Sequence, residues 1–131
     1  MNHLNTHNLS LRNLLDSEER VFHEALSNLT NLDSIDLVLR QCLTIDEMRE
    51  AGSFFTGGEL AKHVVSSFVK PFDTGSVILD PTCGAGNLLI ECSRRLSVCT
   101  TLSATMEMWG QVLWGVDLNK SFVETTKLRL L

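Results

Sequence analysis

Residues 80–88 read Asp80-Pro81-Thr82-Cys83-Gly84-Ala85-Gly86-Asn87-Leu88, a loop with two glycines between a predicted strand and a predicted helix. The run before it, residues 76–80, is apolar and partly β-branched and follows the turn Asp73-Thr74-Gly75, which predicts a buried parallel strand. Residues 87–96 continue as a helix. Glycines between a strand and a helix allow a tight turn and bring a ligand close to the backbone.

A second strand and helix follow. Residues 112–118 are predicted to form a strand, and Asn119 to cap a final helix over residues 120–131. No element is predicted in the variable stretch 97–110. The order strand, helix, strand, helix predicts an α/β fold that opens a doubly wound parallel sheet.

The chain before this sheet is predicted to be helical. Residues 1–15 form a short helix or a frayed start, and a capping box at Asp16 and Glu19 opens a helix with one apolar stripe. Another helix is expected from Asp33 or Ser34 to Glu50. We therefore divide the chain into a helical N-terminal segment, 1–51, and a partial domain, 52–131.

That domain is predicted to open with a helix of its own. A second capping box, at Thr56 and Glu59, begins it, and Pro71 lies beyond its end. Its expected inner face consists of Leu60, Ala61, Val64, Val65 and Phe68.

Composition limits the function classes. The 131 residues are 44% hydrophobic, which excludes a disordered tail, and no apolar run is long enough to span a membrane. No signal sequence is evident, so we expect a cytoplasmic protein. The net charge is −5, and residues 1–51 hold the excess acid, with nine acidic residues against four arginines. Because no basic stripe is visible, DNA would have to be held by another segment.

Metal chemistry is not expected. The four cysteines contain no CxxC pair, so we expect free thiols that are buried or half-buried. His3 and His7 are four residues apart without a third ligand nearby, and we expect both to be exposed.

The glycine loop favours S-adenosylmethionine over a dinucleotide. A dinucleotide fingerprint requires a third glycine at position 89, where the chain has Leu89. Asp80 would repel a pyrophosphate but would pair with an ammonium group, and S-adenosylmethionine carries an ammonium and no phosphate. The alternative is a tight turn without a ligand. Asp117 ends the second strand, where an acid can accept hydrogen bonds from a ribose, or where it is simply a solvated strand end or helix cap.

Four segments together resemble the start of the adenine-specific DNA methyltransferases of bacterial restriction-modification systems, especially the modification subunits of type I systems. They are Gly52-Ser53-Phe54-Phe55-Thr56, Leu60-Ala61, the loop 80–86, and Gly115-Val116-Asp117-Leu118-Asn119. The resemblance covers about residues 50–131. It implies a Rossmann-like fold that binds S-adenosylmethionine.

The resemblance also implies roles for individual residues. Phe55 and Thr56 would contact the methionine part of the cofactor, and Asp80 and Gly84 its amino acid end. Asp117 would hold the ribose. Pro81, Cys83 and Gly86 would complete the cofactor-binding set. Relatives usually have proline where this chain has Gly57, which loosens the start of the helix.

The residues for base capture are missing. Methylation of an exocyclic amine requires a site that stacks a flipped base and accepts its amino hydrogens, and the family provides Asn or Asp, two prolines and an aromatic residue in a row. The only prolines here, Pro71 and Pro81, are not adjacent. We therefore assign no catalytic residue and expect a fragment or split subunit that is inactive alone.

The missing residues for base capture also determine which partners we expect for this chain. We expect the chain to reach DNA only through missing segments or a partner chain, and to associate with a complementary methyltransferase polypeptide or with itself. Two alternatives stay open: an inactive binding or regulatory module of the same fold, and part of an RNA or protein methyltransferase.

Overall fold

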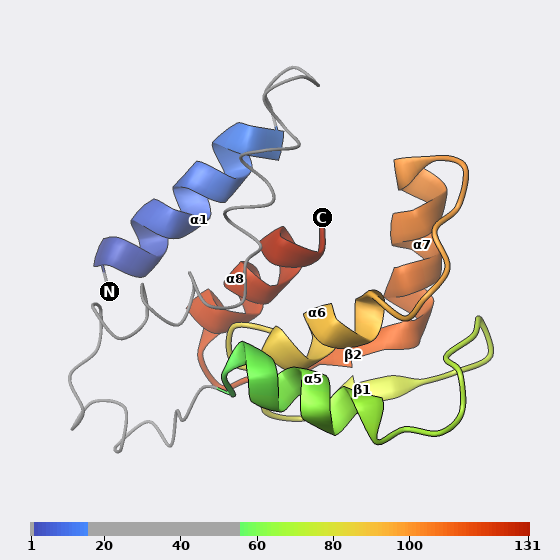
Figure 1. The fold of residues 1–131 in the computed structure, drawn as a ribbon. Coiled ribbons are helices and arrows are strands. Elements are labelled where there is room, and N and C mark those ends of the chain that lie inside the picture. Colours follow the sequence, from blue (N-terminus) through green and yellow to red (C-terminus); the bar gives the residue numbers. More distant parts are fainter. Residues whose placement is uncertain (1, 16–55) are drawn as a thin grey trace.

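The computed structural model of the chain describes residues 2–15 and 56–131, which form a small parallel sheet with helices around it (Figure 1). The helices predicted within residues 16–50 lie outside the described residues. In chain order the elements are α1 (Asn2–Leu15), α5 (Gly58–Ser66), β1 (Ile78–Asp80), α6 (Asn87–Ser93), α7 (Leu102–Val112), β2 (Leu113–Gly115) and α8 (Lys120–Leu130). The α/β prediction is confirmed, because helices alternate with parallel strands.

The sheet places the carboxyl ends of its two strands side by side. β1 pairs with β2 in parallel, with Leu79 opposite Trp114 and Asp80 opposite Gly115. The N–H of Val116 donates to the carbonyl of Asp80 (2.9 Å) and continues the ladder. Both strands are shorter than predicted. β2 starts late because Val112 still belongs to α7.

The prediction that residues 97–110 hold no element is wrong. α7 begins after Thr101, whose hydroxyl accepts a hydrogen bond from the N–H of Ala104 (3.2 Å). The indole of Trp109 donates to the carbonyl of Ser97 (3.3 Å), which ties the helix to the chain before it. The sequence does contain an apolar pattern at helical spacing, formed by Leu102, Met106 and Trp109. The surrounding stretch is rich in Ser and Thr, so this pattern is weak.

The predicted capping box at the start of α5 is also wrong. Gly57 is the N-cap residue, in an extended conformation (φ −61°, ψ 157°), and no side chain caps the helix. Glu59 instead pairs with Lys62 (2.8 Å), one turn further along. Of the five residues predicted for the inner face, Ala61 and Val65 are buried, whereas Leu60, Val64 and Phe68 are exposed.

Arg95 joins the C-terminal ends of α5 and α6. Its guanidinium donates to the carbonyls of Val65 and of Phe68, and it lies 4.8 Å from the ring centroid of Phe72. Val65 lies in the last turn of α5 and Phe68 lies just beyond its end, so Arg95 binds carbonyls at the C-terminal end of this helix. α5 is therefore held beside α6, next to the glycine loop (Figure 1).

α8 packs against both α1 and α6 (Figure 1). Phe122 and Leu128 are buried, so part of the apolar surface of α8 is covered. The hydroxyl of Thr125 donates to Oδ1 of Asn8 on α1 (2.9 Å). Within the described ranges, no helix is long and apolar enough to cross a membrane.

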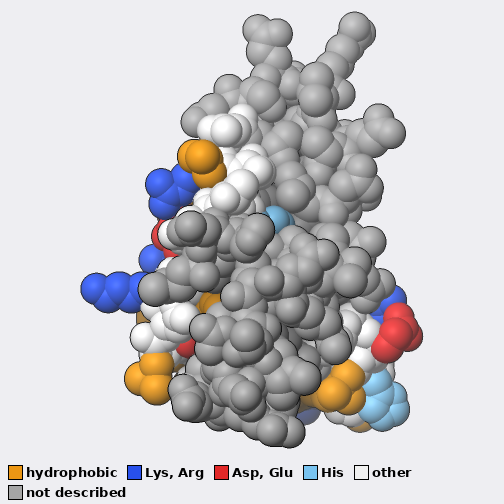
Figure 2. Space-filling model, turned by 90° about the vertical axis from the view of Figure 1, so that its left-hand side faces the viewer, with side chains coloured by type: hydrophobic (Ala, Val, Ile, Leu, Met, Phe, Trp, Pro, Cys, Tyr) orange, Lys and Arg blue, Asp and Glu red, His pale blue; other side chains and the backbone are white. Residues whose placement is uncertain are grey.

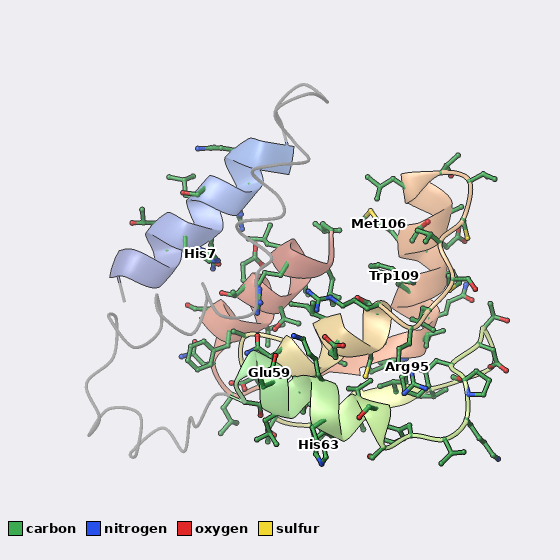
Figure 3. The ribbon with its side chains drawn as sticks, viewed as in Figure 1. His7, Glu59, His63, Arg95, Met106 and Trp109 are labelled. Carbon is green, nitrogen blue, oxygen red and sulfur yellow. The ribbon has the colours of Figure 1, made fainter. Side chains whose placement is uncertain are left out.

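His7 is buried on the side of α1 that faces α8 (Figure 3), which corrects the prediction of an exposed histidine. Its pKa is lowered, first by burial and then by the positive charge of Arg129. The buried imidazole therefore favours its neutral form.

Candidate functional site

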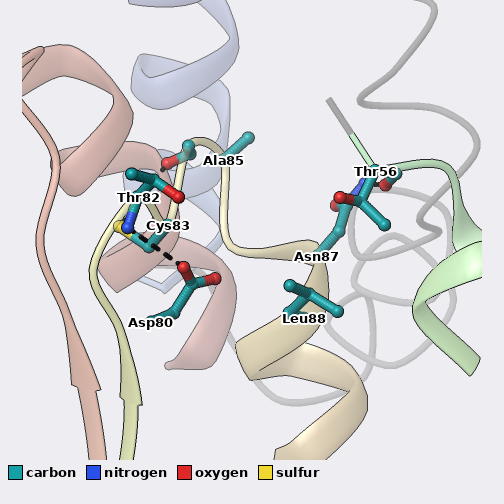
Figure 4. A pocket seen from close by; sticks show the side chains of 8 residues that line it. Thr56, Asp80, Thr82, Cys83, Ala85, Asn87 and Leu88 are labelled. Carbon is teal, nitrogen blue, oxygen red and sulfur yellow. Dashed lines mark hydrogen bonds between the residues drawn. The ribbon is translucent and has the colours of Figure 1, made fainter. Parts of the chain in front are cut away.

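A pocket of about 110 Å³ opens at the carboxyl end of β1 (Figure 4). Three parts of the chain form it: the glycine loop, the start of α6, and Thr56, which precedes α5. The lining consists of Thr56, Asp80, Thr82, Cys83, Gly84, Ala85, Asn87 and Leu88. The fold thus brings together Thr56, Asp80, Cys83 and Gly84 of the predicted site. Pro81, Gly86 and Asp117 are outside the lining, and Phe55 lies outside the described residues.

The loop depends on glycine at two positions. Gly84 and Gly86 have positive φ values of 52° and 87°, which other residues rarely adopt. A Cβ atom on Gly86 would lie 2.7 Å from Cγ2 of Thr126. The hydroxyl of Thr126 also donates to the carbonyl of Gly84 (2.9 Å), so α8 supports the loop through a residue that does not line the pocket.

Asp80 supplies a negative charge to the pocket. Its Oδ1 accepts a hydrogen bond from the N–H of Thr82 (3.1 Å, dashed in Figure 4), so the carboxylate turns toward the loop. Burial, and to a smaller extent the nearby charge of Asp117, raise the pKa of Asp80, although the bond from Thr82 opposes them. A cation in the pocket would offset this unfavourable environment of the carboxylate.

Asp117 links the two loops at this end of the sheet. Its Oδ2 accepts from the N–H of Gly84 (3.0 Å), and its Oδ1 accepts from the N–H of Asn119 (2.8 Å). The helix cap is Asn119 itself, as predicted, because its Oδ1 accepts from the N–H of Ser121 (3.0 Å). A carboxylate has about four acceptor positions, so these two bonds leave Asp117 able to accept others.

Two polar residues at the loop were not predicted. Arg129 on α8 is 4% exposed and donates from Nη1 to the carbonyl of Ala85 and to Oδ1 of Asn87 (2.8 Å for the latter). Asn87 is 5% exposed, and its Nδ2 donates to the carbonyl of Thr56 (2.6 Å). The sequence signal for Arg129 is a charge between two apolar residues, Leu128 and Leu130, within the predicted final helix.

The thiols are poor candidates for nucleophiles. Cys83 and Cys92 are buried, and burial is the main reason that the pKa of Cys83 is raised and that of Cys92 is raised to about 11. Both therefore stay protonated near neutral pH. Cys99 is exposed, contrary to the prediction, and Cys42 lies outside the described residues. The described part of the chain contains no group of three side chains suited to a metal ion.

The face drawn in Figure 2 carries described lysine and arginine side chains at separate places, near acidic ones, and these form no continuous basic surface. DNA binding normally involves clustered positive charge, so the described residues on this face offer no obvious DNA-binding surface.

Comparison with known proteins gives one result. A family model described as N-6 DNA methylase matches residues 37–130. Neither a curated protein nor a solved structure matches the chain.

Proposed function

The chain belongs to the N-6 DNA methylase family, and on this premise we propose that its pocket binds the amino acid end of S-adenosylmethionine. The whole chain would then be the cofactor-binding part of an adenine-N6 DNA methyltransferase of a restriction-modification system. The observation that carries this proposal is the half-buried carboxylate of Asp80, which faces a pocket walled by glycine backbone and Thr56.

The residues present fit this ligand. An ammonium group would stabilise the ionised form of the half-buried Asp80 carboxylate, whose pKa is raised. Gly84 lines the pocket without a side chain, so a ligand can approach the backbone there. The pocket volume, about 110 Å³, is below the roughly 300–1,000 Å³ of complete small-molecule sites. It therefore suits one end of the cofactor.

Each residue would have a distinct role. When bound, S-adenosylmethionine supplies an activated methyl group. Asp80 would bind the ammonium, and Gly84 would lie against the amino acid end. Asp117 would accept ribose hydroxyls through the acceptor positions that Gly84 and Asn119 leave unused. Asp117 would then have both a structural and a binding role.

Capture of the target base would come from other residues. The sequence lacks the Asn-Pro-Pro-aromatic tetrapeptide. We propose that a complementary methyltransferase polypeptide supplies it and holds the DNA. We expect no methyl transfer from labelled cofactor to DNA by this chain alone. Incorporation that disappears in Asp80→Asn would contradict this expectation.

A regulatory module of the same fold is the second candidate, and the missing tetrapeptide favours it. Mixing the chain with a methyltransferase polypeptide that carries the tetrapeptide separates the two candidates. Methylation that requires both polypeptides supports the split enzyme. Association without methylation supports the regulatory module.

Calorimetric titration with S-adenosylmethionine tests the site. Asp80→Asn keeps the acceptor for Thr82 but removes the charge, so we expect roughly a tenfold to hundredfold weaker affinity. The matched control is Asp73→Asn, which changes an exposed aspartate in a turn outside the pocket. Equal affinity of the wild type and Asp80→Asn would show that the site is assigned wrongly.

A further inference from the structure

Hydrogen bonds connect Arg129 on α8 to Thr56 by way of Asn87, which directly follows the last glycine of the loop. Arg129 on α8 donates to the loop carbonyl of Ala85 and to Oδ1 of Asn87 (2.8 Å for the latter). Asn87, in the first turn of α6, donates from Nδ2 to the carbonyl of Thr56 (2.6 Å). Figure 4 shows the side chain of Asn87 reaching toward Thr56. We call Thr56, Asn87 and Arg129 the relay.

The chemistry of the relay fixes the orientation of the Asn87 amide. Arginine has only donors, so the amide oxygen must face Arg129, and the amide nitrogen must then face the carbonyl of Thr56. Both ends of the amide already have partners in the chain. Asn87 lines the pocket, yet these bonds hold it in place and commit it to the protein rather than to a ligand.

The relay joins two walls of the pocket that are far apart in the sequence. Thr56 lies on one wall, and Gly84 and Ala85 lie on the other. Asn87 and Arg129 are both buried, so water competes little for their hydrogen bonds. The separation of the two walls is therefore set by these side chains as well as by the packing of α5 on α6.

We propose that Asn87 and Arg129 are positioning residues that hold Thr56 at a fixed distance from the glycine loop, so that both walls bind S-adenosylmethionine together. This inference rests on the proposed function. It goes beyond that function because neither residue belongs to the predicted cofactor-binding set. A ligand that contacts both walls binds more tightly when they are already in place, since the cost of ordering them has been met in folding.

The decisive variant is Asn87→Asp. It preserves the shape of the side chain and the acceptor for Arg129, but it places a carboxylate oxygen against the carbonyl of Thr56. We expect about tenfold weaker binding of both S-adenosylmethionine and S-adenosylhomocysteine, measured by calorimetry. An effect of the added negative charge alone would not weaken both ligands equally. It would favour S-adenosylmethionine, which has a cationic sulfonium, over S-adenosylhomocysteine, which has a neutral thioether. Asn13→Asp, on the exposed surface of α1, is the matched control.

Hydrogen exchange gives a readout besides affinity. In the wild type, S-adenosylmethionine should slow amide exchange both at residues 56–60 and at residues 80–87. In Asn87→Asp, at a ligand concentration that saturates the site, protection should persist in the loop and be lost at 56–60. Arg129→Lys, which retains a donor and the charge, should recover more of this protection than Arg129→Met.

The outcomes separate the two claims. A wild type that binds neither ligand contradicts the proposed function and, with it, the role of the relay. A wild type that binds, alongside an Asn87→Asp variant with unchanged affinity and unchanged protection at 56–60, overturns the relay alone. If Arg129→Met does not fold, Asn87→Asp still decides, because it retains the hydrogen bond to Arg129.

Discussion

The carboxylate of Asp80 has a less favourable environment in the folded chain than in water, because burial and Asp117 raise its pKa. The ordinary pKa of an aspartate is about 3.9. When the folded pKa is higher, the folded chain binds a proton more tightly than the unfolded chain does. Ionisation of Asp80 therefore lowers stability as the pH rises between the two pKa values, and the loss persists at higher pH.

Asp80→Asn should for this reason stabilise the chain while weakening the binding of S-adenosylmethionine. We expect a higher melting temperature than the wild type at about pH 7. The difference should shrink as the pH falls through the raised pKa of Asp80, and it should vanish below the ordinary aspartate pKa of about 3.9. Thermal melts over this range measure it. The control Asp73→Asn changes an exposed aspartate, where burial adds no cost. A destabilised Asp80→Asn at neutral pH would mean that the negative charge supports the loop.

Replacement of glycine by alanine should have opposite effects on the free energy of unfolding at two positions in the chain. Gly86→Ala should lower the free energy of unfolding by about 1–3 kcal/mol, because φ is 87° there and the new Cβ would meet Thr126. Gly110→Ala should raise it by roughly 0.5–1 kcal/mol, because Gly110 lies in α7 with nothing within 4 Å of a new Cβ. Urea denaturation measures both. Equal effects of the two substitutions would contradict the loop geometry.

At the scale of elements, the sequence predicted the strands, turns and helices that short local patterns determine. The run before Asp80 and the two loop glycines identified β1, the turn and the start of α6, because those residues themselves dictate strand, turn and helix. α7 escaped prediction because its cap, Thr101, stands among other Ser and Thr residues. The contacts of Arg129 span more than forty residues of sequence, so no local pattern could indicate them.

The start of α5 provides a test at this scale. Gly57 has φ −61°, which is within the range that proline imposes, so the glycine is not required by the backbone angle. Gly57→Pro should raise the free energy of unfolding by about 0.4–1 kcal/mol, because it restricts the unfolded chain. Chemical denaturation measures this, with Gly57→Ala as the control for loss of glycine alone. A less stable proline variant would mean either that the proline ring clashes with the backbone of Thr56 or that the fold needs the N–H of Gly57, which proline lacks.

At the scale of the whole molecule, one face of the sheet is apolar and uncovered. Leu79 and Trp114 are register partners and are 60% and 55% exposed. Val77 and Val116, two residues away along each chain, are 75% and 57% exposed. Within the described ranges the sheet has two strands, so each strand also has an edge that bonds no other described strand. Such faces and edges favour association.

We expect the purified chain to associate in a concentration-dependent way, and this surface to be responsible. Val77→Thr with Leu79→Thr keeps residues that are compatible with an extended strand and removes part of the apolar face, so the variant should shift light scattering and sedimentation toward the monomer. Val69→Thr, which changes a valine that is 95% exposed outside the sheet, should leave the assembly unchanged. A complementary polypeptide that covers the same face should dissociate the self-assembly when added. A monodisperse wild-type monomer of 14.6 kDa with a sharp thermal transition would contradict this prediction and would mean that the chain is stable with the face exposed to water.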